Sequence, residues 1–205
     1  MNILCFGDSN TFGISPVDGK RLAETERWPS ILAKLLGSEH QVIEAGQPNR
    51  TLVKDPPFSG DKSGIKYLKP YLEAHTVDVI IIQLGTNDLK ARFTLSAIDI
   101  TQALEELILA IKAFYHGQTQ PKIIILSPPK IHEVGSYKSI YAGAGKKAEQ
   151  LPIEFKAAAD RHTCEFLDSY PLIKPCKKEG IHLPVSAHRE LANSLTPIIK
   201  KAAVY

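Results

Sequence analysis

The chain of 205 residues is 43 % hydrophobic and 23 % charged, with a formal net charge of +3. This length matches one ordinary domain, and this composition excludes a disordered chain. The weak positive charge does not indicate nucleic-acid binding, and no apolar run reaches the roughly 20 residues of a membrane span. We therefore expect one domain over residues 1–205, with neither a nucleic acid nor a membrane as partner.

The three cysteines, Cys5, Cys164 and Cys176, lack metal-type spacing. An odd number of cysteines that need no disulfide is typical of a reducing compartment. The N-terminus enters a strand-like run without the basic and then apolar segment of a signal peptide. We therefore expect a cytoplasmic protein.

Short apolar, β-branched runs alternate with longer amphipathic segments along the chain. The expected strands cover residues 3–6, 41–44, 78–83, 122–126 and 163–167. The expected helices cover residues 28–36, 65–74, 97–115, 148–160 and 186–203. Ser186 and Glu190 bracket the start of the last of these helices, and we expect them to cap it. Five strands that alternate with helices predict an α/β fold with a parallel sheet and helices on both faces.

Polar side chains follow the expected strands at the points where the strands end. Ser9 comes after the first strand, Asn49 after the second and Asn87 after the third, and His182 lies beyond the fifth. Ligands of parallel sheets bind outside the carboxyl ends of the strands. We therefore expect these residues to lie at one edge of the sheet.

Together these residue types suit acyl transfer through a serine. A serine hydroxyl becomes a nucleophile when a base such as His182 removes its proton, and a carboxylate orients the imidazole. Glu179 can supply that carboxylate, because a glycine-containing loop lets it fold back over three residues. The backbone N–H groups of Ser9 and Asn49 and the side-chain amide of Asn87 can bind the oxyanion.

Each of these residues also has an ordinary structural explanation. Gly, Asp, Ser and Asn are common turn residues, and a lone histidine is more often structural than a base. We expect Asp8 to order its own turn and Asp88 to cap the segment that follows it. The sequence contains no H-E-x-x-H or C-x-x-C motif, so we expect no metal.

Three blocks occur in order and are spread over nearly the whole chain: Phe6-Gly7-Asp8-Ser9, Gly85-Thr86-Asn87-Asp88 and Glu179-Gly180-Ile181-His182. They resemble the F-G-D-S, G-x-N-D and D-x-x-H blocks of the SGNH or GDSL-type hydrolases. The longer stretches ILCFGDSNTFG, VIEAGQPNRT and VIIIQLGTNDLKARF resemble the bacterial arylesterase and acyltransferase subgroup. The resemblance implies a three-layer, flavodoxin-like fold with a five-stranded parallel sheet, and ester hydrolysis through an acyl-serine without a cofactor.

The resemblance also implies roles for single residues. Ser9 is the nucleophile and one oxyanion donor, Asn87 is another donor, and His182 is the base. Asn49 stands where the family usually has glycine, but a backbone N–H serves with any side chain. Glu179 stands where the family usually has aspartate, and Asp168, directly after the fifth expected strand, is the alternative partner of His182.

We expect a serine esterase of small aryl or alkyl acyl esters, able to pass the acyl group to alcohols as well as to water. One alternative is a deacetylase of carbohydrates or other small molecules, and another is a non-catalytic, flavodoxin-like binding module. The expected partner is a small-molecule ester, and the sequence leaves open whether the chain forms a homo-oligomer. Two connections, 51–64 and 127–145, are long enough to be functional. We expect the second, with Tyr137 and Tyr141, to form a wall of the acyl pocket, from the same subunit or a neighbouring one.

Overall fold

The computed structural model describes residues 1–53 and 63–202. Most of the expected long connection 51–64 and the last residue of the expected helix 186–203 lie outside these ranges. Among the described residues, no helix is long and apolar enough to cross a membrane.

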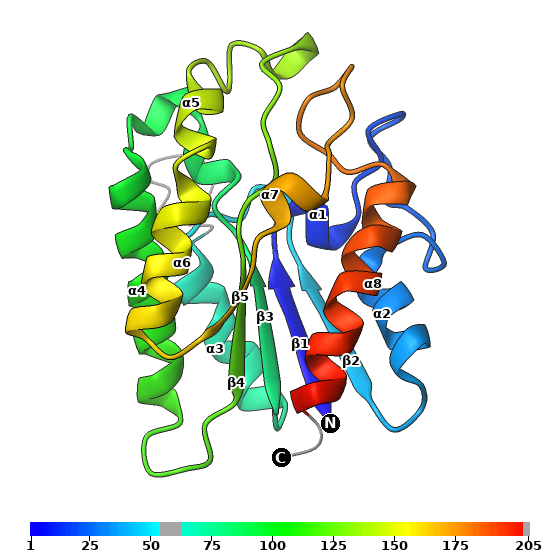
Figure 1. The fold of residues 1–205 in the computed structure, drawn as a ribbon, viewed down its shortest axis with the longest axis vertical. Coiled ribbons are helices and arrows are strands. Elements are labelled where there is room, and N and C mark those ends of the chain that lie inside the picture. Colours follow the sequence, from blue (N-terminus) through cyan, green and yellow to red (C-terminus); the bar gives the residue numbers. More distant parts are fainter. Residues whose placement is uncertain (54–62, 203–205) are drawn as a thin grey trace.

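Within the described residues, five parallel strands form one sheet (Figure 1). The strands are β1 (Asn2–Gly7), β2 (Gln41–Gly46), β3 (Val79–Gln83), β4 (Lys122–Leu126) and β5 (Glu165–Leu167). Their order is β2-β1-β3-β4-β5, which is the flavodoxin-like order. The strands β1 and β3 are neighbours in the sheet, and the direction of strand order reverses between them. Sheets of this kind bind ligands at such a switch point. The predicted fold class is confirmed.

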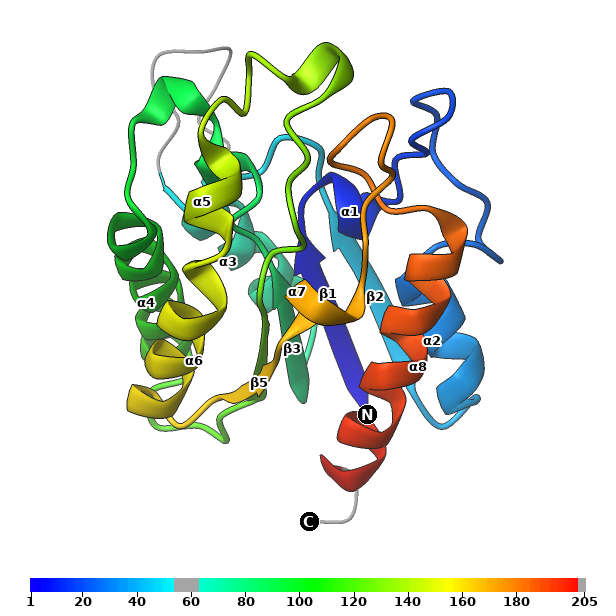
Figure 2. The same ribbon diagram turned by 45° about the horizontal axis from the view of Figure 1, so that its top comes forward.

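Helices cover both faces of the sheet (Figures 1 and 2). One face carries α3 (Gly64–Ala74), α4 (Ala97–Phe114) and α6 (Leu151–Arg161). The other carries α2 (Trp28–Leu36) and α8 (Val185–Ala202). Short helical turns lie in the connections: α1 (Ser9–Phe12), η1 (Asn87–Leu89), η2 (Ala91–Phe93), η3 (Gly135–Tyr137), α5 (Ala144–Ala148) and α7 (Ser169–Leu172).

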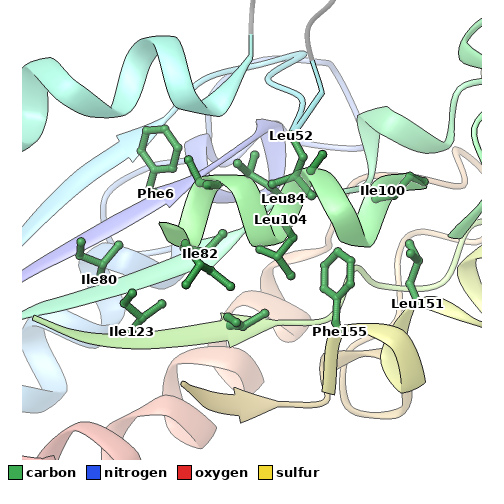
Figure 3. Packing of buried hydrophobic residues seen from close by; sticks show 14 of the residues in the cluster. Phe6, Leu52, Ile80, Ile82, Leu84, Ile100, Leu104, Ile123, Leu151 and Phe155 are labelled. Carbon is green, nitrogen blue, oxygen red and sulfur yellow. The ribbon is translucent and has the colours of Figure 1, made fainter. Parts of the chain in front are cut away.

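The core has two halves because successive strand residues point to opposite faces of a sheet. In β1, Leu4 and Phe6 pack on the side of α3, α4 and α6, whereas Ile3 and Cys5 pack on the side of α2 and α8. Burial on both sides explains why the central strands are almost continuously apolar. Figure 3 shows the first half of the core, where strand side chains pack against those of α4 and α6: Phe6, Ile80, Ile82, Leu104 and Phe155.

The expected helix over residues 148–160 is confirmed as α6, although α6 begins three residues later than expected. The short helix α5 (Ala144–Ala148) ends before α6 (Leu151–Arg161), and Pro152 is the second residue of α6. Proline has no N–H and its ring clashes with the carbonyl four residues earlier, so it fits best in the first turn of a helix. Pro152 therefore favours a helix that begins at Leu151.

Strand β5 begins at Glu165 and not at residue 163. Thr163 has a φ of 53°, and the Cys164 N–H donates to the Ala159 carbonyl at 2.8 Å. These two residues complete the C-terminal turn of α6, so they are not available to the sheet.

Helix α8 begins at Val185, which places Ser186 inside its first turn rather than at its cap. The N–H groups of Ala187 and His188 donate to the carbonyl of Pro184. Pro184 thus precedes the helix and accepts its first backbone bonds, and the predicted capping role of Ser186 is wrong.

Candidate active site

Ser9 is the first residue of α1, directly beyond the end of β1, and it is 6 % exposed. A Cβ atom on Gly7, the last residue of β1, would overlap Thr11 and approach the Gln83 carbonyl oxygen to 2.8 Å. Glycine therefore lets the chain turn sharply from strand into helix. The carboxylate of Asp8 accepts the Asn10 N–H at 2.9 Å, so Asp8 orders its own turn as predicted.

The structure brings Ser9, His182 and Glu179 together. Nε2 of His182 lies 3.0 Å from Oγ of Ser9, and Nδ1 of His182 lies 2.6 Å from Oε1 of Glu179. His182 is 7 % exposed and reaches Ser9 across 173 positions of sequence. An imidazole in this arrangement can remove the hydroxyl proton while a carboxylate fixes its tautomer.

The Glu179 side chain folds back onto its own loop. Its Oε2 accepts the backbone N–H groups of Ile181 at 2.9 Å and His182 at 2.7 Å. Gly180 has a φ of 99°, and a Cβ atom there would overlap the His132 carbonyl oxygen, so the bend requires glycine. Burial opposes ionisation of Glu179, but the hydrogen bonds from His182 and Ile181 outweigh it and lower the pKa of the carboxyl. Glu179 is therefore a carboxylate at neutral pH.

Asp168, the alternative partner of His182, is engaged elsewhere. Its Oδ1 accepts the Ser127 hydroxyl at 2.7 Å and the Tyr170 N–H at 3.1 Å. Asp168 thereby caps α7 and joins it to the end of β4.

Asn10 links the start of α1 to both neighbours of His182. Its Oδ1 accepts the Leu183 N–H at 3.1 Å, and its Nδ2 donates to the Ile181 carbonyl at 3.4 Å. The side chain is 1 % exposed. Asn10 thus fixes the histidine loop relative to Ser9, a role that the sequence alone does not reveal.

Asn49 has a left-handed backbone, with a φ of 65°. Asparagine tolerates this conformation better than most residues other than glycine. Its Oδ1 accepts a hydrogen bond from Nζ of Lys90 at 2.8 Å. Within the described part of the chain, the backbone N–H groups of Ser9 and Asn49 have no acceptor. Both remain available to an external oxygen.

The Asn87 side chain is bonded on both sides of its amide and is 3 % exposed. Its Nδ2 donates to the Arg50 carbonyl at 3.0 Å, and its Oδ1 accepts the Tyr141 hydroxyl at 3.2 Å. Asparagine has two amide hydrogens, so one of them remains. Asn87 therefore has a donor left for a bound substrate.

Arg50 ties the ends of β1 and β2 together. Its guanidinium donates to the carbonyls of Gly7 and Ala45 and lies 4.2 Å from the centroid of the Phe6 ring. The same residue's carbonyl holds Asn87. Arg50 thus connects three strand ends at the switch point of the sheet.

The expectation that Asp88 caps the segment after it is wrong. Its carboxylate accepts the N–H groups of Leu52 at 2.9 and 3.1 Å and of Val53 at 2.9 Å, in the connection after β2. Burial raises the pKa of Asp88 to about 7 and that of the neighbouring Asp8 to about 6. Two buried carboxyls thus lie beneath the site.

A cavity of about 560 Å³ opens at this edge of the sheet. Figure 2 brings this edge of the sheet forward and shows that α1, the segment before α5 and the connection before α8 lie around the edge. Nine residues that line the cavity carry polar or aromatic groups: Ser9, Asn49, Asn87, Lys90, Arg92, Tyr137, Ser139, Tyr141 and His182. The prediction that the 127–145 segment forms a wall is confirmed, and here the wall comes from the same subunit.

Within residues 1–53 and 63–202, no group of three or more His, Cys, Asp or Glu side chains is arranged to hold a metal ion. The contacts of Asn10, Arg50 and Lys90 were not predicted, and Tyr141 was predicted only as a wall residue. Their partners lie far away in the sequence, for example 41 positions for Lys90 and 54 for Tyr141. No periodicity or motif signals such contacts.

The sequence matches the model of the GDSL-like Lipase/Acylhydrolase family over residues 5–189. Est24, a carbohydrate acetylesterase from Sinorhizobium meliloti, is 29 % identical with a TM-score of 0.93, covering 100 % of this chain and 99 % of its own. The native aryl esterase of M. smegmatis is 32 % identical with a TM-score of 0.91, covering 98 % and 99 %. A putative arylesterase from Agrobacterium tumefaciens is 26 % identical with a TM-score of 0.88, covering 98 % and 99 %.

Comparison with curated proteins gives no match. The family match nevertheless spans most of the chain and confirms the resemblance of the three sequence blocks. The chain is therefore an ester-hydrolysing member of the GDSL-like lipase/acylhydrolase family.

Proposed function

We propose that this enzyme hydrolyses esters of small acyl groups through an acyl-serine intermediate at Ser9. The observation that carries the proposal is the pair of contacts from Ser9 to His182 at 3.0 Å and from His182 to Glu179 at 2.6 Å. These contacts lie at a cavity large enough for a small ester.

In this mechanism, Nε2 of His182 takes the hydroxyl proton as Oγ of Ser9 attacks the ester carbonyl carbon. The carbonyl π electrons move to the oxygen, and the C–O bond to the alcohol then breaks as His182 returns the proton to the leaving alkoxide. Water repeats the sequence on the acyl-serine and releases the acid. Glu179 keeps the imidazole in the productive tautomer and stabilises the imidazolium without taking a proton.

The oxyanion of each tetrahedral intermediate would accept three hydrogen bonds. The donors are the free backbone N–H groups of Ser9 and Asn49 and the remaining amide hydrogen of Asn87. Their positions are fixed before substrate arrives, because Lys90 holds Asn49 and two hydrogen bonds hold Asn87. Donors fixed in advance cost no reorganisation during the reaction.

Acetyl esters are the substrates that we propose first, with aryl or carbohydrate alcohols as leaving groups. The similar structures include aryl esterases and a carbohydrate acetylesterase, which supports both kinds of leaving group. Turnover should be measured on p-nitrophenyl esters from acetate to octanoate beside a panel of acetylated sugars. Higher kcat/KM for acetylated sugars than for aryl acetates would favour the deacetylase, and a decline with acyl length would support a small acyl pocket.

We also propose that an alcohol can replace water in the second half of the reaction, since the same acyl-serine would be attacked. Hydrolysis of p-nitrophenyl acetate in the presence of benzyl alcohol would then yield benzyl acetate. Acetate alone would contradict acyl transfer and leave hydrolysis intact. A single domain over residues 1–205 and a cytoplasmic location stay predictions, and a homo-oligomer stays open.

A further inference from the structure

The amide oxygen of Asn87 has its own hydrogen-bond donor, the hydroxyl of Tyr141 at 3.2 Å. An asparagine amide can be rotated by 180°, which exchanges its oxygen and nitrogen. The Arg50 carbonyl can only accept, so it requires nitrogen on its side, and the hydroxyl of Tyr141 satisfies the oxygen on the other side. Both contacts favour the one orientation that leaves an N–H for the substrate oxygen.

Tyr141 is held firmly enough to serve as a fixed donor. It is 2 % exposed and belongs to the main hydrophobic core. Its N–H donates to the Tyr137 carbonyl at 3.0 Å, and its carbonyl accepts the Ala144 N–H at 2.9 Å. The adjacent Ile140 carbonyl accepts the Ala91 N–H at 2.8 Å, which ties the segment to residues just after Asn87.

A hydrogen bond to an amide oxygen also strengthens the amide's own N–H as a donor, because linked hydrogen bonds polarise one another. Burial raises the pKa of Tyr141 well above its ordinary value, so the hydroxyl keeps its proton at neutral and mildly alkaline pH. Without this hydroxyl, the amide oxygen would be left unpaired in a buried place. Only the Arg50 carbonyl would then orient the Asn87 amide. In the molecules in which the amide rotates by 180°, its oxygen would face the developing negative charge.

We propose that Tyr141 is a positioning residue that orients and polarises the Asn87 amide for oxyanion binding. This inference rests on the proposed function, in which Asn87 binds the oxyanion. It gives the 127–145 segment a role in rate, beyond that of a pocket wall.

The test is Tyr141→Phe, which removes the hydroxyl and keeps the buried ring. We expect kcat for p-nitrophenyl acetate to fall about 3- to 10-fold, the range of one ordinary hydrogen bond. KM should change less than about twofold, because the amide acts mainly on the transition state. The matched control is Tyr115→Phe. Tyr115 is a buried tyrosine that caps the C-terminal end of α4 and lies near Val77 and Asp78, at the amino end of β3, so its substitution should leave kcat unchanged.

A double-mutant cycle separates positioning from a merely structural role. In an Asn87→Ala background, Tyr141→Phe should cause no further loss of kcat, because the residue through which it acts is gone. An equal loss in both backgrounds would overturn the inference, as would an unchanged kcat in Tyr141→Phe. Thermal melting of each variant checks that it is folded.

Failure of the proposed function gives a different result from failure of this inference. Ser9→Ala measured in parallel should abolish turnover. If Ser9→Ala stays active, the proposed function is wrong. If Ser9→Ala is inactive but the cycle shows no coupling, only the role of Tyr141 is wrong.

Discussion

Glu179→Gln tests the carboxylate of the proposed catalytic group. In the wild-type protein, one oxygen of Glu179 faces Nδ1 of His182 at 2.6 Å, and the other accepts two backbone N–H groups at 2.9 and 2.7 Å. Glutamine has one carbonyl oxygen and one NH₂ group, so it cannot serve both places. If the oxygen stays with the backbone donors, the NH₂ group faces Nδ1, and the imidazole must carry its proton on Nε2. That tautomer cannot accept the proton of Ser9.

The size of the effect follows from the competing arrangement. Turning the glutamine oxygen toward His182 would leave two buried N–H groups unpaired, at a cost of about 1–3 kcal/mol each. A total of about 2–6 kcal/mol means that the productive arrangement is populated in roughly one molecule in 30 to one in 10⁴. We therefore expect kcat to fall by about 30- to 10⁴-fold, while the fold is retained.

The assay is p-nitrophenyl acetate hydrolysis by wild-type, Glu179→Gln and Asp168→Asn proteins, with folding checked by thermal melting. Asp168→Asn is the matched control, because its carboxylate bonds Ser127 and Tyr170 and lies away from His182. Its kcat should stay within about threefold of wild type, since it loses only structural hydrogen bonds. The reasoning is refuted if folded Glu179→Gln keeps more than about a tenth of wild-type kcat, or if Asp168→Asn loses as much.

Three further predictions concern the oxyanion donors and the buried carboxyls. Asn87→Ala should lower kcat by about 10²–10³-fold with little change in KM, and an effect on KM alone would make the amide a ground-state binder. Asn49→Gly should keep kcat within about threefold, because glycine retains the N–H and adopts the φ of 65° without strain; a loss beyond tenfold would mean that the side chain, held by Lys90, matters more than the N–H. The pKa of Asp88 is raised by burial to about 7, above its unfolded value near 4, so its proton stabilises the folded protein at low pH and this contribution is lost as pH rises toward 7. Between pH 5 and pH 8, the free energy of unfolding measured in urea should therefore fall less for Asp88→Asn than for wild type, by a difference on the order of 2 kcal/mol. Equal falls in the two proteins would contradict the raised pKa of Asp88.

Much of the fold could be predicted because the central strands are buried on both sides. The run Val79–Gln83 is apolar and β-branched almost throughout, and such runs bounded by turn residues identify central parallel strands. The sequence also predicted that Ser9 and His182 lie at the same edge of the sheet, for a related reason. The carboxyl ends of parallel strands share one edge, so residues that follow them meet without any knowledge of packing.

Element boundaries were less predictable where local chemistry competed with hydrophobic pattern. The helix expected over residues 148–160 begins only at Leu151, with Pro152 in its first turn, although the apolar spacing continues from Ala148. Thr163 is β-branched and suggests strand, but its positive φ serves the end of α6. In both places a single backbone requirement outweighed the side-chain pattern.

The supporting contacts of the site could not be predicted, because each depends on how distant segments pack. Asp88 satisfies Leu52 and Val53 rather than its own neighbours, and Asn10 bonds residues on both sides of His182. Turn statistics describe only local partners for these residue types. These supporting contacts can therefore be recognised only in the three-dimensional structure.

Covalent labelling with a fluorophosphonate tests the central claim most directly, because the reagent reacts with an activated serine and mimics the tetrahedral intermediate. The account predicts one adduct per chain on the peptide that contains Ser9, with loss of turnover in proportion to labelling. It also predicts no adduct and no turnover in a folded Ser9→Ala protein. An adduct on another residue, or turnover that survives in Ser9→Ala, would contradict the account.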